Sequence, residues 1–128
     1  MISPRPESLA VVAQRATDPR TFRYELTDFL HEFQQRRTLS MLAEQPQRMA
    51  NRFEMAAVYD VFLAAVAEHL AHEIGCEAPA WAGQETRVLS SPWFAAKSGD
   101  LRAVLLVESP AAFRARNLFV SANALSVA

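Results

Sequence analysis

The sequence is poor in the residues from which disulfides, metal sites and phosphate-binding loops are built. It has one cysteine, Cys76, so an internal disulfide is excluded, and no closely spaced set of cysteines and histidines suggests zinc. Its 3 glycines form no phosphate-cradling loop, and no serine lies in a Gly-x-Ser-x-Gly motif. The sequence therefore predicts no cofactor and no metal, and the lone cysteine favours a reducing compartment.

Long apolar runs and an excess of one charge are also missing. The longest apolar stretch, Met55 to Ala67, spans 13 residues and contains Asp60, whereas a membrane-spanning helix needs about 20. The first residues resemble neither a signal peptide nor a lipidation motif. With 13 basic and 14 acidic residues, the net charge of −1 creates no field that attracts nucleic acid or a membrane. We expect a cytoplasmic protein without membrane association.

What the sequence does have is the composition of a folded domain, with 51% hydrophobic and 21% charged residues in 128. We expect residues 1–128 to form a single all-α domain, a compact bundle of about five or six helices. One helix begins at Asp18 and Pro19, and another at Ser109 and Pro110, because a capping side chain followed by proline is typical of helix starts.

The centre of the predicted bundle is a helix over about residues 47–74, which Gly75 ends. Its part from Met55 to Ala67 is apolar nearly all round, so it must be central or must contact a partner. Residues 101–108 fit a buried helix or a strand, and a helix is favoured because no second strand candidate is apparent. The residues expected in the core are Phe22, Phe29, Phe33, Phe62, Val66, Leu105 and Phe113.

Three aromatic residues are candidates for a partner-binding site. Trp81, Trp93 and Phe94 lie in residues 76–100, where several prolines and glycines predict an ordered loop with short helical turns. Buried aromatic anchors dominate many protein interfaces. Filling of the core beneath the loop is an equal alternative, because a small domain needs such side chains in any case.

Two pairs of arginines are the basic clusters of the chain. Arg114 and Arg116, beside Asn117, could bind a partner's carboxylate or a phosphate, although solvation or capping of their own helix is favoured. Arg36 and Arg37 form the other pair. Two arginines neutralise few phosphates, so we do not expect the isolated chain to bind nucleic acid.

The histidines do not form a recognised metal motif. His69 and His72 are three residues apart beside Glu68 and Glu73, and His31 lies on a different predicted helix. A solvated helix end is favoured over a metal site. No nucleophile, base and metal-ligand set is recognisable, so we expect no enzyme activity.

Residues 109–120 read Ser-Pro-x-x-Phe-Arg-x-Arg-Asn-Leu-Phe-Val. This string resembles an uncharacterised bacterial family that is abundant in actinobacteria, and residues 91–94, 101–108, 60–70 and 26–33 resemble the same family. The resemblance thus covers most of the chain, and residues 109–120 are its most specific part.

The resemblance implies a genetic setting. Members tend to be encoded beside a nucleotidyltransferase-like protein, a pattern similar to toxin–antitoxin or regulator–enzyme pairs. Some members carry an additional helix-turn-helix domain, for which the roughly 20 residues before the second helix are too few. We therefore expect a non-catalytic protein-interaction module, antitoxin-like or an accessory subunit of a nucleotidyltransferase-fold partner. The alternatives are a small transcriptional regulator that uses the two arginine pairs and a self-associating homodimer or larger homo-oligomer.

Overall fold

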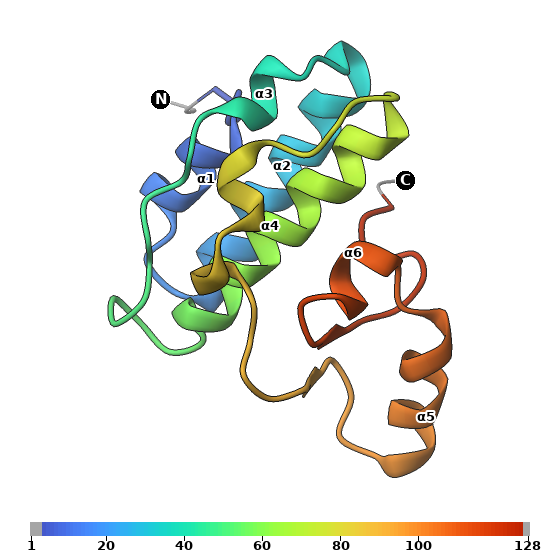
Figure 1. Ribbon diagram of the computed structural model, residues 1–128. Coiled ribbons are helices and arrows are strands. Elements are labelled where there is room, and N and C mark those ends of the chain that lie inside the picture. Colours follow the sequence, from blue (N-terminus) through green and yellow to red (C-terminus); the bar gives the residue numbers. More distant parts are fainter. Residues whose placement is uncertain (1–3, 127–128) are drawn as a thin grey trace.

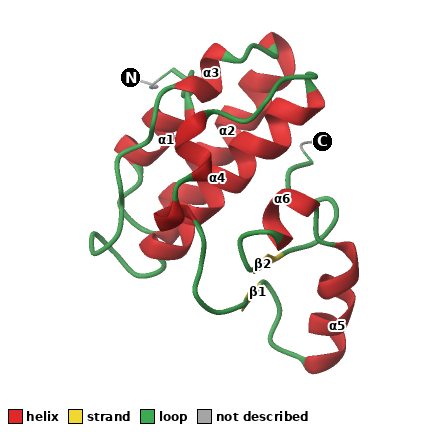
Figure 2. Ribbon diagram, viewed as in Figure 1, coloured by secondary structure: helices red, strands yellow, loops and turns green. Residues whose placement is uncertain are grey.

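The computed structural model describes residues 4–126, which form six α-helices and little strand (Figures 1 and 2). The predicted all-α fold is confirmed. The helices are α1 (Leu9–Arg15), α2 (Pro19–Arg36), α3 (Ser40–Ala43), α4 (Ala56–Glu73), α5 (Gly99–Glu108) and α6 (Ala111–Arg114). The shorter elements are the 3₁₀ helices η1 (Ala80–Gly83) and η2 (Glu85–Arg87) and the strands β1 (Trp93–Phe94) and β2 (Leu118–Phe119). Between residues 4 and 126, every helix is too short or too polar to span a bilayer.

Local capping signals set the starts of α1 and α2. The Ser8 hydroxyl accepts a hydrogen bond from the backbone N–H of Val11 at 3.2 Å. At α2 the Asp18 carboxylate accepts from the N–H of Thr21 at 2.7 Å, and the Thr21 hydroxyl accepts from the N–H of Asp18 at 3.0 Å. This reciprocal capping, with Pro19 at the first helical position, confirms the predicted start of α2.

Helix α4 lies at the centre of the molecule, as the sequence predicts. In Figure 1 it runs beside α2, and it contacts α1, η1, η2 and α6 on its other sides. Eleven of its residues are buried, so the chain itself covers the apolar stretch that could have contacted a partner. The helix ends where Gly75 takes a left-handed φ of 74°, which confirms the predicted glycine cap.

The central helix begins at Ala56, and the prediction that it starts near residue 47 is wrong. Asn51 and Met55 have left-handed φ angles of 74° and 73°, which interrupt a right-handed helix. The backbone N–H groups of Met49 and Ala50 donate to the Asp60 carboxylate, at 2.7 and 3.0 Å, instead of to helical carbonyls. The carboxylate of Asp60 therefore holds residues 47–55 against α4 as a loop.

The strands β1 and β2 were not predicted. They pair in parallel, with Trp93 opposite Leu118 and Phe94 opposite Phe119. Strands of two residues are too short to show the alternating pattern by which a sequence indicates a strand. Their pairing joins the segments on either side of α5 and α6.

Ser109 does not cap the helix that was predicted to begin at Ser109 and Pro110. Helix α6 is four residues long and begins at Ala111, with no side-chain cap. The Ser109 hydroxyl lies 2.6 Å from the carbonyl oxygen of Leu105 and accepts a hydrogen bond from the N–H of Val120 at 2.8 Å. Ser109 therefore ties the end of α5 to the residue that follows β2.

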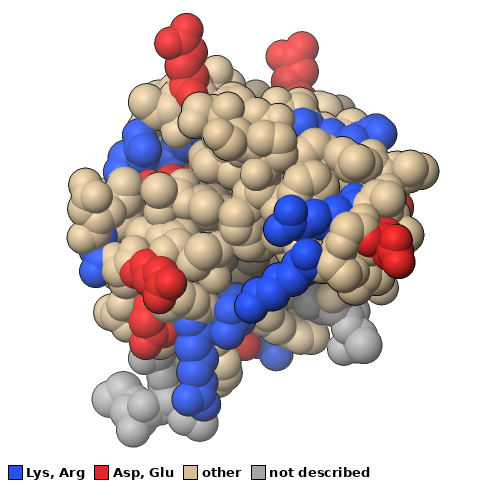
Figure 3. Space-filling view, turned by 90° about the horizontal axis from the view of Figure 1, so that it is seen from below, with Lys and Arg blue, Asp and Glu red and all other residues tan. Residues whose placement is uncertain are grey.

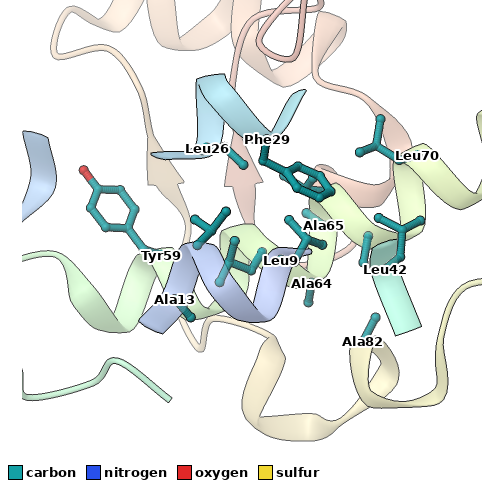
Figure 4. Close-up of a cluster of buried hydrophobic side chains, with 14 of the residues drawn as sticks. Leu9, Ala13, Leu26, Phe29, Leu42, Tyr59, Ala64, Ala65, Leu70 and Ala82 are labelled. Carbon is teal, nitrogen blue, oxygen red and sulfur yellow. The ribbon is translucent and has the colours of Figure 1, made fainter. Parts of the chain in front are cut away.

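The predicted core is confirmed with one exception. Figure 4 shows the main cluster, where side chains from α1, α2, α3, α4 and η1 meet. The predicted residues that are buried are Phe22, Phe29, Phe33, Val66, Leu105 and Phe113. Phe62 of α4 is only partly buried, because it lies on the wall of a cavity that residues of α2 also line.

Candidate protein-interaction site

Trp81, one of the three aromatic candidates, belongs to the core. Its side chain is buried, and its indole N–H donates to the carbonyl oxygen of Leu42 at 2.9 Å. The guanidinium carbon of Arg87 lies 5.1 Å from the centre of its ring, a cation–π distance. Trp81 therefore fixes η1 on the helical layer and offers little surface to a partner.

The two arginines of the C-terminal candidate pair lie in different environments. Arg116 is buried, and its guanidinium donates to the carbonyls of Ala112 and Ala82, both at 2.8 Å, and to Glu68 Oε1 at 3.1 Å. It joins α6 to η1 and α4. Arg114 is exposed, and its side chain forms no hydrogen bond or ion pair with a described residue. Arg114 and Arg116 therefore do not form one positively charged binding site.

Asn117 shapes the loop between α6 and β2. Its backbone has a left-handed φ of 65°, which asparagine tolerates better than most residues. Its side-chain amide donates to the carbonyl of Leu89 at 2.7 Å, and its own carbonyl accepts from the N–H of Trp93 at 2.8 Å. Asn117 therefore positions β1 beside β2.

The other two aromatic candidates are partly buried on β1. Phe94 stacks on Phe119 of β2 with ring centroids 4.9 Å apart, and the guanidinium of Arg102 lies 5.2 Å from the Phe94 ring centre. Arg102 belongs to α5 and also donates to the carbonyl of Ala96 at 3.0 Å. Phe94 therefore supports α5, whereas Trp93 lines the cavity shared with Phe62.

Four of the seven exposed large hydrophobic side chains of the described residues lie on helix α5. Val107 is 79% exposed, and Leu101, Val104 and Leu106 are between 49% and 57% exposed. We call these four residues the α5 surface. Only Leu105 of this helix is buried, and in Figure 1 α5 lies farthest from the helical layer. Sequence reasoning missed this surface, because it took the apolar residues of 101–108 as a sign of burial.

The basic clusters offer little free positive charge. Arg36 lies 3.4 Å from Glu7 and 3.9 Å from Glu32, and Arg37 donates to the side chain of Gln34 at 2.8 Å. Of the four arginines in the two pairs, Arg114 alone has no side-chain partner among residues 4–126. On the face in Figure 3, basic and acidic side chains are both spread among uncharged ones.

His31 and His69 line the same cavity, although they belong to different helices. The cavity has a volume of about 620 Å³ and lies at the C-terminal ends of α2 and α4. Glu73 also lines it, with an oxygen 3.8 Å from the His69 ring nitrogen Nε2. Among residues 4–126, no three histidine, cysteine or acidic side chains come close enough together to hold a metal ion.

A buried charge pair beneath η2 was also missed from the sequence. Asp60 is fully buried, and one of its oxygens lies 4.0 Å from the guanidinium of Arg87. Arg87 donates to the carbonyls of Asp60 and Pro46, at 3.0 and 2.7 Å. Burial lowers the pKa of Arg87 from its ordinary value, and the Asp60 carboxylate opposes that shift. The signal in the sequence is an aspartate inside the otherwise apolar stretch Met55 to Ala67. The hydrogen bonds of the pair to Met49, Ala50 and Pro46 hold the loop before α4 on this helix.

Comparisons with models of known families, with curated proteins and with solved structures find no match to this chain.

Proposed function

We propose that this protein is a non-catalytic protein-interaction module whose contact region is the α5 surface. One observation carries the proposal: of seven large hydrophobic side chains that are exposed in residues 4–126, four lie on this ten-residue helix. Contiguous exposed apolar surface of this kind marks interaction sites in soluble proteins, because water contact with it is unfavourable.

A protein partner fits the α5 surface better than a membrane does. Helices that bind anionic membranes carry lysine and arginine along one face. Helix α5 has one basic residue, Arg102, which is engaged with Phe94 and Ala96, and it has acidic residues at both ends, Asp100 and Glu108. An apolar centre between polar ends is the usual composition of a protein interface.

The partner that we propose is a nucleotidyltransferase-fold protein encoded beside this chain. The support is the resemblance of residues 101–120, which include most of α5, to the family found in that setting. In this proposal the chain is an antitoxin-like or accessory subunit, and α5 docks over the partner's active-site cleft and excludes its substrates.

The test is co-expression with the neighbouring gene product, followed by size-exclusion chromatography and a growth assay. The disruptive variant is Val104→Lys with Val107→Lys, and the matched control is Tyr24→Lys on α2, since all three side chains are exposed. We expect wild type and control to co-elute with the partner and to change its effect on growth. The double variant should do neither, while its melting temperature stays close to that of wild type.

Two results would overturn the proposal. Equal co-elution of the double variant and the control would exclude the α5 surface as the contact region. Separate elution from the neighbour, together with a homodimer of wild type that the double variant converts to monomer, would show instead that α5 pairs with a second copy of this chain.

A further inference from the structure

A second cavity, distinct from the α5 surface, has an aromatic wall and a volume of about 410 Å³. Helices α2 and α4 line it, together with Trp93 of β1 and the turn at Ala124. Phe22 and Tyr59 stack with parallel rings 4.0 Å apart, and Phe62 meets Phe22 edge to face at 6.2 Å. These rings are held by the packing of α2 on α4, so the wall exists before any ligand arrives.

The polar groups of the cavity are mainly hydrogen-bond donors. Arg23 is its only charged lining residue, is exposed, and forms no hydrogen bond or ion pair with residues 4–126. The indole N–H of Trp93 also has no hydrogen-bond partner among the described residues, unlike that of Trp81. Thr27, which is exposed, and Tyr59 add hydroxyl groups that can donate or accept, and no acidic residue lines the cavity.

Size and chemistry together define a class of ligand. Small-molecule sites commonly enclose about 300–1,000 Å³, with mostly apolar walls and a few polar groups that set the orientation. Free donors with one positive charge match an anionic oxygen acceptor, because a guanidinium binds a carboxylate through charge-assisted hydrogen bonds. The aromatic wall matches a flat apolar body.

We propose that this cavity binds a small organic acid with an aromatic body. The body lies against Phe62 and Trp93, the partly buried rings of the cavity, and the carboxylate pairs with Arg23 at the rim. The site is independent of the α5 surface, and its occupancy does not depend on the proposed protein partner.

The test uses naphthylacetate as probe and its uncharged analogue naphthylacetamide as matched control ligand. Amide NMR spectra of the labelled protein report on two indole N–H groups, of which Trp93 lines the cavity and Trp81 lies in the core. We expect naphthylacetate to shift the Trp93 signal and to leave the Trp81 signal in place. Its affinity should exceed that of the amide by about tenfold, the effect of one charge-assisted contact.

Two variants separate charge from shape. Arg23→Gln should remove the preference for acid over amide, whereas Arg20→Gln should keep it, because Arg20 is exposed on the same helix but does not line the cavity. Ala124→Phe, in the exposed turn, should block both ligands.

An unmoved Trp93 signal with saturating naphthylacetate would overturn the proposal. Equal affinity of wild type for acid and amide would do the same, because it would define a site for neutral apolar molecules. A preference for the acid that persists in Arg23→Gln would place the carboxylate elsewhere and exclude the proposed pairing.

Discussion

Helices α4 and α5 are both rich in apolar residues, but their surroundings differ. Helix α4 is contacted by α1, η1, η2 and α6 and packs against α2, and eleven of its residues are buried. Helix α5 contacts β2, and one of its ten residues is buried. Apolar composition therefore does not decide whether a helix lies in the core. Whether an apolar helix is buried depends on how many other helices and strands pack against it. An apolar helix with few such neighbours keeps an exposed surface that another molecule can bind.

The strongest test of this comparison is removal of the negative charge buried in α4, the Asp60 carboxylate. Asp60→Ala leaves Arg87 buried without a counter-charge and frees the N–H groups of Met49 and Ala50. We expect a loss of about 3–5 kcal/mol in the free energy of unfolding, measured by urea denaturation. Asp100→Ala in the exposed first turn of α5 is the control and should change it by less than about 0.5 kcal/mol.

The same substitution in each helix gives a direct comparison. Leu63→Ala opens a cavity at a fully buried position of α4 and should cost about 2–5 kcal/mol. Leu106→Ala shortens a side chain that is 49% exposed and should cost less than about 0.5 kcal/mol. Denaturation midpoints measure both. Similar losses in the two variants would mean that α5 is as well packed as α4, and the contrast would be lost.

The attachment of α5 should be weaker than the packing of α4. Ser109→Ala removes the acceptor for the buried N–H of Val120 and should cost about 1–3 kcal/mol. Hydrogen exchange should accelerate in α5 and at Val120 but not in α4. Ser90→Ala, at an exposed position, is the control. Uniform acceleration throughout the chain would show that α5 and α4 unfold together.

The smallest predicted effect is at the exposed cap of α2, Asp18. The hydrogen bond from the backbone N–H of Thr21 lowers the pKa of Asp18 below its ordinary value of 3.8. The carboxylate therefore stabilises the folded state above that value, and its contribution is lost as the pH falls through the lowered pKa. Asp18→Asn retains an oxygen that can cap the helix but cannot titrate. Denaturation should show a slightly less stable variant near neutral pH, and the difference should shrink as the pH falls below 3.8.

The elements that sequence reasoning predicted correctly are those set by neighbouring residues. Asp18 and Pro19 start α2 with groups three residues apart, and Gly75 ends α4 through its own backbone conformation. The elements that it missed depend on distant residues. Asp60 holds the loop that contains Met49 and is paired with Arg87, and no local pattern links those positions.

The candidate site was predicted less well for the same reason. Trp81, Arg116 and Asn117 are residue types that often bind partners, and a sequence does not reveal what already satisfies them. Each donates to a backbone carbonyl far along the chain, 39, 34 and 28 residues away. Apart from Leu105, the apolar residues of α5 were misjudged in the other direction: they were expected to be buried and are exposed. A buried helix and an exposed one can have the same apolar composition, so the sequence does not distinguish them.

Residues 96–108 form a surface segment whose two ends lie close together beside β2. The N–H of Ala95 donates to the carbonyl of Phe119 at 3.0 Å, and the N–H of Val120 donates to the Ser109 hydroxyl at 2.8 Å. Between these two anchors only Leu105 is buried. Residues 96–108 can therefore be replaced as a unit, since replacing a surface segment with adjacent ends disturbs little of the packing around α4.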